Sequence, residues 1–308
     1  MSDGSEQGAS APLAPLAPLA PLAPLADAYL GYTQEQLDAF YDQRIWVPDW
    51  EAEVTRLRAM GEQAQSALDF QRDVAYGPAA QERMDIYPAK SRNAPVHIHV
   101  HGGGWRNMSK EDAAFMAGDF VQAGVHYIAL DFSALPEVRL PDVVAQIRRA
   151  IEFVHQSAAS FGGDPDRIYV SGHSSGAHIV SALLTMDGAA GASLRQIIKG
   201  ALCVSGMYDL RPVVASSRRS YVKLDEREVQ ELSAINHCAR IACPVSVAYG
   251  QFDNAEFARH SKSFEHALTS AGIEHDFAEI EAVNHYQIMG QIPSLATRCA
   301  AFAGMWAR

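Results

Sequence analysis

Ser174 stands in a sequence setting that favours nucleophilic catalysis. It is the central residue of Gly172-His-Ser-Ser-Gly176, which follows the apolar run Ile-Tyr-Val and precedes a helical pattern. Glycines in such a strand–turn–helix segment allow a sharp turn, so the serine hydroxyl projects from the end of the strand. A helix-entry turn with a capping serine is the alternative interpretation. The apolar strand before the turn favours the nucleophile.

A glycine-rich segment upstream could stabilise the negative charge that such a nucleophile generates. His101-Gly-Gly-Gly-Trp105 follows an expected strand and precedes the serine motif, which is the order of the α/β-hydrolases. Successive glycines expose backbone N–H groups, and an oxyanion hole is built from such donors. We expect the N–H groups of Gly102, Gly103 and Ser175 to form it. A plain glycine turn is the weaker interpretation.

A catalytic acid and a catalytic base should follow the nucleophile, each after a late strand. Asp253 follows the penultimate expected strand, and His285 is the only histidine after the last one. Asp209, which follows the preceding strand, is the alternative acid, and a loop-capping role is possible for either aspartate. Order and placement together select Ser174, Asp253 and His285 as a triad for acyl transfer to water.

Three histidines alternate along the strand before the glycine-rich segment. His97, His99 and His101 therefore share one strand face, a pattern that a metal site could also produce. No carboxylate or cysteine joins them at ligand spacing, so we interpret them as core or loop-bracing residues. We expect no metal and no other cofactor.

The composition excludes several classes of partner. The 308 residues carry a net charge of −11, and no basic patch is visible, which argues against nucleic acid and against anionic membranes. No apolar run approaches the length of a membrane helix, and no secretory signal is present. The chain has four cysteines, which are Cys203, Cys238, Cys243 and Cys299. They form neither a disulfide framework nor a zinc motif, so we expect reduced thiols and a cytoplasmic protein.

The pattern of secondary structure predicts an α/β fold with a mostly parallel central sheet and helices on both faces. Residues 27–70 read as a helical lead-in that could cap the site, with Thr33 and Gln36 in capping-box spacing. A second lead-in helix is expected from about residue 50 to 68, and a later helix at 141–155. Expected strands lie at 72–76, 83–87, 96–100, 126–130, 167–171, 200–205, 244–249 and 275–279. The first two strands look antiparallel.

A repeat separates the chain into two parts. Residues 11–25 are five copies of Ala-Pro-Leu, a pattern that excludes helix and sheet and favours polyproline II. A PxxP ligand or a stiff spacer is one interpretation. A low-complexity repeat with no partner is the preferred one, because no basic residue accompanies the prolines. We therefore expect a disordered tail at 1–26 and a single domain at 27–308.

Motifs spread along most of residues 30–305 resemble one known family. They are His101-Gly-Gly-Gly-Trp105-Arg, Phe161-Gly-Gly-Asp-Pro-Asp-Arg167, the serine motif through His178, Ser205-Gly-Met-Tyr-Asp-Leu210 and Tyr249-Gly-Gln-Phe-Asp253. Together they resemble the kynurenine formamidase (arylformamidase) branch of the α/β-hydrolases, near the hormone-sensitive-lipase-like esterases. The resemblance implies the same triad and an oxyanion loop at Gly102–Gly104. Gly104 stands where these formamidases more often carry tyrosine, which leaves a more open site.

These features favour a serine hydrolase that cleaves a small amide such as an aryl formamide. A short-chain carboxylesterase and a non-catalytic ligand-binding protein are the alternatives. Gly104, Trp105 and Tyr286 are candidate pocket residues, although ordinary packing would account for the two aromatic rings equally well. A cap could carry basic residues that pair with a substrate carboxylate or simply face solvent, namely Arg211, Arg218 and Arg219. The expected partner is a small amide or ester substrate, and the protein is expected to be a monomer or a homodimer.

Overall fold

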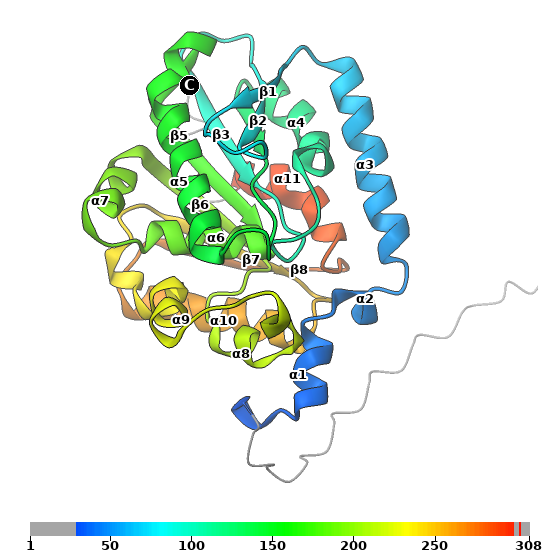
Figure 1. The fold of residues 1–308 in the computed structure, drawn as a ribbon. Coiled ribbons are helices and arrows are strands. Elements are labelled where there is room, and N and C mark those ends of the chain that lie inside the picture. Colours follow the sequence, from blue (N-terminus) through cyan, green and yellow to red (C-terminus); the bar gives the residue numbers. More distant parts are fainter. Residues whose placement is uncertain (1–28, 299–301, 303–308) are drawn as a thin grey trace, which may run out of the picture.

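Eight strands form one sheet in the computed structural model, which describes residues 29–298 and residue 302 (Figure 1). The strand order is β1-β2-β4-β3-β5-β6-β7-β8. The strands are β1 (Gln71–Ala75), β2 (Arg83–Tyr87), β3 (Ala94–Val100), β4 (His126–Leu130), β5 (Gly163–His173), β6 (Ile198–Val204), β7 (Val245–Gly250) and β8 (His275–Ile280). All eight expected strands are present, and β5 begins earlier than expected, at Gly163.

The sheet is mostly parallel, as the sequence predicts. β4, β3, β5, β6, β7 and β8 pair in parallel, whereas β1 and β2 are antiparallel to their neighbours. Strands that are buried on both faces explain the near-continuous apolar runs. Because parallel strands end at the same edge, the loops after β3, β5, β7 and β8 gather at one side of the sheet.

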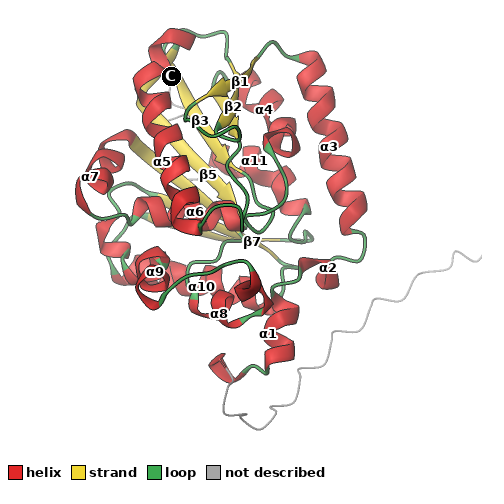
Figure 2. Cartoon of the chain, viewed as in Figure 1, coloured by secondary structure: helices red, strands yellow, loops and turns green. Residues whose placement is uncertain are grey.

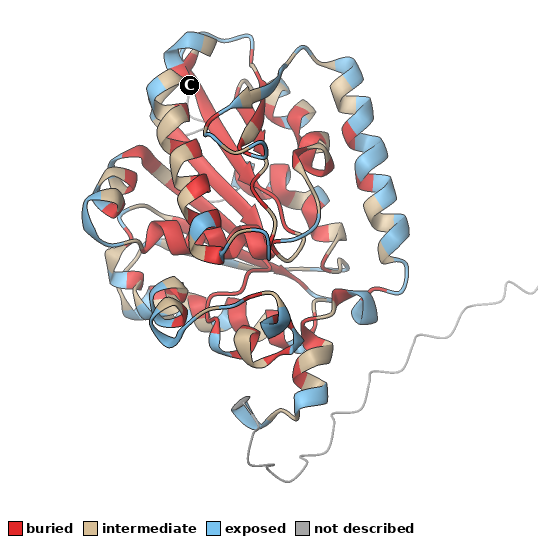
Figure 3. Cartoon of the chain, viewed as in Figure 1, coloured by how far each residue is buried: buried red, intermediate tan, exposed pale blue. Residues whose placement is uncertain are grey.

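Helices cover both faces of the sheet (Figure 2). They are α1 (Gln34–Phe40), α2 (Gln43–Trp46), α3 (Trp50–Ala67), α4 (Ala117–Gln122), α5 (Leu140–Ser157), α6 (Ser175–Leu184), α7 (Gly188–Ile197), α8 (Arg211–Ala215), α9 (Glu226–Leu232), α10 (Ala255–Ser270) and α11 (Ile292–Arg298). One apolar cluster joins the sheet to α5, α6, α7 and α10, and a second joins the opposite face to α3, α4 and α11. Figure 3 shows the strands buried between these layers.

The lead-in segment contains three helices, α1 to α3. Thr33 begins α1 with the expected capping box: its Oγ1 accepts from Gln36 N at 3.2 Å, and Gln36 Oε1 accepts from Thr33 N at 2.9 Å. The helix α3 packs against the 3₁₀ helix Lys110–Met116 and leaves much of its surface exposed (Figure 3). The Ala-Pro-Leu repeat lies outside the described residues.

Candidate active site

The predicted nucleophile lies on a strained turn at the end of β5. Ser174 has φ 53° and ψ −117°, an unfavourable region for a residue with a side chain. A Cβ on Gly176 would lie 2.1 Å from Val100 O, so only glycine allows α6 to approach β3 this closely. Ser174 N donates to Val204 O at 2.8 Å, which fixes the turn to the neighbouring strand. The turn is therefore overdetermined by its surroundings, which is the property of a nucleophile elbow.

The three residues selected from sequence order meet at the carboxyl edge of the sheet. His285 Nε2 lies 3.0 Å from Ser174 Oγ, and His285 Nδ1 lies 2.6 Å from Asp253 Oδ1. The carboxylate can only accept, so Nδ1 carries the proton and Nε2 is free to accept the serine proton. All three side chains are buried or nearly so. This geometry supports the assignment of nucleophile, base and acid.

The acid is held by two further donors. Asp253 Oδ2 accepts from Ser205 Oγ at 2.6 Å and from Gly250 N at 3.0 Å. Burial alone raises the pKa of the Asp253 carboxyl, but His285 and these donors outweigh it and hold the pKa below its usual value. Ser205 was not predicted from the sequence, although its place directly after β6, beside the end of β7, is a usable signal.

The alternative acid takes no part in this arrangement. Asp209 is bound by Arg211, whose Nη2 donates to Asp209 Oδ2 at 2.7 Å and whose Nε donates to Oδ1 at 2.9 Å. The carboxylate holds the guanidinium of Arg211 beside the start of α8. The structure therefore favours Asp253 as the acid.

The glycine-rich loop runs beside the elbow. Within the described part of the chain, the N–H groups of Gly102 and Gly103 make no backbone hydrogen bond. Ser175 is the first residue of α6, so its N–H has no acceptor within the helix. Trp105 N donates to Ser175 Oγ at 3.2 Å and ties the loop to the helix start. These N–H groups support the predicted oxyanion hole.

His173, the residue before the nucleophile, supports the base. Its Nε2 lies 2.8 Å from the carbonyl oxygen of His285, so Nε2 donates and Nδ1 is unprotonated. Burial, reinforced by the neighbouring imidazole of His285, lowers the pKa of His173 to about 3, so its ring is neutral. His173 had no role predicted from the sequence, and its hydrogen bond links β5 to the loop after β8.

A cavity of about 740 Å³ opens over the nucleophile. Of the sequence candidates, those that line it are Gly103, Gly104, Ser174, His285, Tyr286 and Arg218. The other two basic candidates do not line the cavity, because Arg211 binds Asp209 and Arg219 donates to Gln34 Oε1 and Ala215 O. Of the three candidate arginines, Arg218 alone lines the cavity.

Trp105 does not line this cavity, so the structure favours packing over the pocket wall, the two interpretations that the sequence left open. Its side chain is fully buried and meets His178 edge-on, with ring centroids 5.3 Å apart. The backbone at Trp105 has φ 62°, which turns the indole away from the glycine-rich loop into the core. Its place next to that loop indicated proximity to the site but did not set the direction of its side chain.

The alternating histidines lie behind the active site in the core. His97 Nε2 and His99 Nδ1 lie 2.7 and 2.8 Å from Ser171 Oγ, and His101 stacks on Phe132. Burial lowers the pKa of His97 to about 3. Among the described residues, no group of three or more His, Cys, Asp or Glu side chains is placed to hold a metal ion. These histidines pack in the core, where His97 and His99 contact Ser171 and His101 contacts Phe132.

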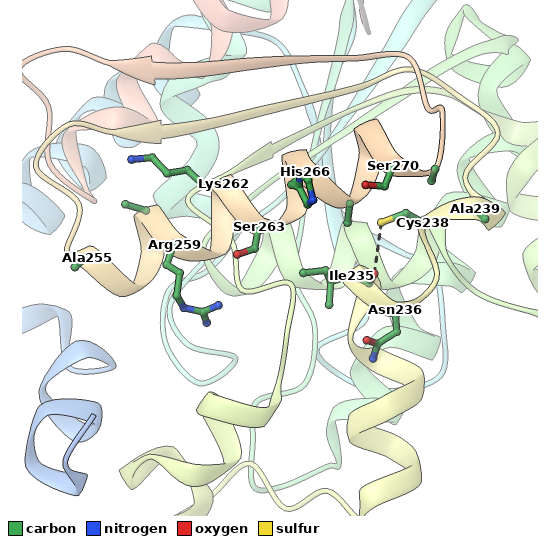
Figure 4. A pocket seen from close by; sticks show the side chains of 13 residues that line it. Ile235, Asn236, Cys238, Ala239, Ala255, Arg259, Lys262, Ser263, His266 and Ser270 are labelled. Carbon is green, nitrogen blue, oxygen red and sulfur yellow. Dashed lines mark hydrogen bonds between the residues drawn. The ribbon is translucent and has the colours of Figure 1, made fainter. Parts of the chain in front are cut away.

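A second depression, of about 1010 Å³, lies along α10 (Figure 4). Arg259, Lys262 and His266 line it from the helix, opposite Cys238 and its neighbours. The guanidinium of Arg259 already binds Glu256 at 2.7 Å, and Cys238 Sγ donates to backbone carbonyl oxygens. None of the triad residues lines this depression, so the chemistry belongs to the other cavity.

The fold is that of the α/β-hydrolases, and comparisons with known proteins identify the chain as a hydrolase of the serine-hydrolase type. A kynurenine formamidase of Danio rerio is 30% identical over 84% of this chain and 92% of its own length. Esterase LipQ of Mycobacterium tuberculosis is 28% identical over 69% of this chain and 56% of its own length. The BD-FAE family matches residues 84–199. The chain belongs to the kynurenine formamidase family.

Solved structures match the fold over most of the chain. A Silicibacter sp. TM1040 protein, provisionally assigned as a thioesterase, has a TM-score of 0.75 at 21% identity, covering 84% of this chain and 95% of that chain. A thermostable carboxylesterase from a metagenomic library has a TM-score of 0.64 at 16% identity, covering 91% and 98%. Within the described residues, no helix is both long and apolar enough to cross a membrane.

Proposed function

We propose that this enzyme hydrolyses small aryl formamides through a formyl-enzyme formed on Ser174. The observation that carries the proposal is the hydrogen-bonded series Ser174–His285–Asp253, at 3.0 and 2.6 Å, beside a cavity large enough for an aromatic substrate. Support for the leaving group comes from the similarity to kynurenine formamidases, which are relatives in sequence over most of the chain.

In the proposed reaction, His285 accepts the proton of Ser174 as Oγ attacks the formyl carbon. The N–H groups of Gly102, Gly103 and Ser175 bind the tetrahedral oxyanion, and loss of one such donor typically costs about 3–4 kcal/mol of barrier. His285 then donates the proton to the departing aryl amine. A water molecule, deprotonated by the same imidazole, attacks the formyl-enzyme, and formate and free serine result.

Hydrolysis of short-chain carboxylic esters is the second candidate function. Gly104 favours it, because the wall of the cavity at this position carries no side chain. A relative named as an esterase also matches most of the chain. A non-catalytic binding protein is the third candidate, and the intact triad argues against it.

Purified enzyme assayed with N-formylkynurenine and with p-nitrophenyl acetate tests the proposal. The aryl formamide should have the higher kcat/KM, and Ser174→Ala should lower turnover of both substrates by about 10³-fold or more, since it removes the nucleophile. A preference for the ester would favour the carboxylesterase. Full activity of Ser174→Ala would overturn the serine mechanism itself, and EDTA should leave the activity unaltered.

We further propose a cytoplasmic location and a monomer or homodimer. Cys203, Cys238 and Cys243 are unpaired thiols, which suits a reducing compartment, whereas Cys299 lies outside the described residues. Size-exclusion chromatography with light scattering would measure the oligomeric state.

A further inference from the structure

Gln43, at the start of α2, presents an unpartnered amide to the catalytic cavity. It is 8% exposed, and neither Oε1 nor Nε2 has a hydrogen-bond partner among the described residues. A buried amide without partners is costly, so native proteins rarely keep one unless a ligand or water completes it. Gln43 lines the same cavity as Ser174.

Arg218 brings a buried positive charge to that cavity. The residue is 8% exposed, and its Nε and Nη2 donate to Tyr41 O at 3.1 and 2.9 Å. No carboxylate of the described residues forms an ion pair with it. Its Nη1 donates to Met207 Sδ at 3.4 Å, and the rings of Tyr41 and Trp105 lie 5.4 and 5.7 Å from its guanidinium carbon. A guanidinium has five N–H donors, so these bonds leave one N–H on each terminal nitrogen for another acceptor. A buried cation without an anion is unfavourable, which points to an anion supplied by a ligand.

The two carboxylates that line the cavity form their ion pairs with arginines other than Arg218. Arg44 binds Asp42 at 2.6 Å, and Arg58 binds Asp112 at 2.9 Å, so each of these carboxylates already has its own arginine. Arg106 lies over the ring of Tyr221, 4.5 Å from its centroid. The lining of the cavity therefore carries an excess of positive charge.

Gly104 opens the route between the oxyanion loop and this arginine. A Cβ built on Gly104, at φ +64°, would lie 3.4 Å from Tyr221 OH and 3.8 Å from the Arg218 guanidinium carbon. Any larger side chain at this position would fill the space in front of Arg218. The glycine thus keeps the guanidinium reachable from the nucleophile side of the cavity.

We infer that Arg218 and Gln43 form a substrate subsite that binds a carboxylate on the leaving-group half of the substrate. The inference rests on the proposed function, because a formyl group has no room for a carboxylate and the aryl amine must carry it. Arg218 belongs to the 3₁₀ helix Ser217–Ser220 and binds the carbonyl of Tyr41, two residues before Gln43. The two side chains therefore reach the cavity from two segments that contact each other. A planar carboxylate suits both the guanidinium fork and the amide N–H₂.

The test compares formanilide with 2-, 3- and 4-formamidobenzoate, which are the same aryl formamide with a carboxylate added. The unaltered enzyme should cleave at least one carboxylate isomer with at least a tenfold higher kcat/KM than formanilide. Arg218→Met should lower kcat/KM for that isomer at least tenfold more than for formanilide, mainly through KM. Gln43→Leu should act in the same direction with a smaller loss.

Arg219→Met is the matched control, because this neighbouring arginine faces outward and binds Gln34 and Ala215. It should keep the preference of the unaltered enzyme for the carboxylate isomer. Equal losses for formanilide and the carboxylate isomers in Arg218→Met would overturn the subsite, since a purely structural arginine would affect all substrates alike.

Two further measurements separate this inference from the proposed function. If no formamide is cleaved, phenyl acetate and the three acetoxybenzoates replace the series, and the same preference is expected at the same arginine. If Arg218→Met fails to fold, competitive inhibition of the unaltered enzyme decides: benzoate should inhibit at least tenfold more strongly than benzamide. Equal inhibition by the two would overturn the carboxylate subsite.

Discussion

At the scale of single residues, the active site combines one strained residue with several fixed hydrogen bonds. The positive φ of Ser174 costs of order 1–3 kcal/mol, and the hydrogen bond to Val204 with the close approach at Gly176 keeps the strain in place. Asp253 is fixed by three donors, from His285, Ser205 and Gly250. Because the Ser174 turn and the Asp253 carboxylate are both held in place, His285 can bond to both residues in only one ring orientation.

Asp253→Asn should lower kcat/KM for p-nitrophenyl acetate by about 10³–10⁴-fold, because an amide can donate to Nδ1 and so stabilise the wrong tautomer of His285. Steady-state kinetics of the purified variant measure the loss. Asp209→Asn is the control, since its partner Arg211 does not line the catalytic cavity, and it should lose less than tenfold. A larger loss in Asp209→Asn than in Asp253→Asn would reverse the assignment of the acid.

At the scale of elements, the lead-in segment completes the wall of the active site. Asn254, the residue after the acid, caps α10 and donates from Nδ2 to Phe40 O at 2.8 Å. Tyr41 OH donates to Glu256 Oε1 at 2.9 Å and accepts from His260 Nε2 at 2.8 Å, since His260 Nδ1 accepts from a backbone N–H. The contacts at the end of α1 thus fix the segment that carries Gln43.

Tyr41→Phe should lower the free energy of unfolding by about 1–3 kcal/mol, because Glu256 and His260 each lose a buried hydrogen-bond partner. Urea denaturation monitored by circular dichroism measures the change. Tyr32→Phe is the control, because its ring packs on Phe40 and no hydrogen bond of its hydroxyl is found among the described residues. Equal stability changes in the two variants would contradict the proposed role of the Tyr41 hydroxyl.

At the scale of the whole molecule, the partly buried carboxyl of Asp131, beside His101, should make stability depend on pH. Burial raises the pKa of Asp131 to about 6, although Lys110 N donates to its Oδ1 at 2.7 Å. Between about pH 4 and 6, the native state retains this proton while the unfolded chain has lost it. Raising the pH through this window therefore weakens the native state, and the penalty stays constant above it.

Asp131→Asn removes this titration, so the stability of the variant relative to the unaltered protein should rise between pH 4 and 6. The difference should reach at most about 3 kcal/mol, because the raised pKa spans about two pH units. Chemical denaturation at several pH values measures it. Parallel profiles for the two proteins would contradict the prediction.

The sequence predicts the framework of this molecule better than the surroundings of its cavity. Apolar runs located all eight strands, and chain order located Asp253 and His285, because both signals are local or follow from topology. The role of Trp105 stayed open between pocket wall and packing, because its neighbours in sequence do not determine the direction of its side chain. Gln43 was not identified because its environment is made by segments far away in the chain. Contacts of that kind depend on packing in three dimensions.

The long separation between these segments also has a consequence for synthesis. The bond from Tyr41 to Glu256 spans 215 positions, and the base lies later still, at residue 285. On the ribosome, the lead-in emerges before α10, and its contact with α10 must wait until the residues between them have been synthesised. A nascent chain that ends before the loop after β8 has the nucleophile and the oxyanion loop but no base. Hydrolytic activity should therefore arise only after residue 285 has been synthesised and the lead-in has met α10.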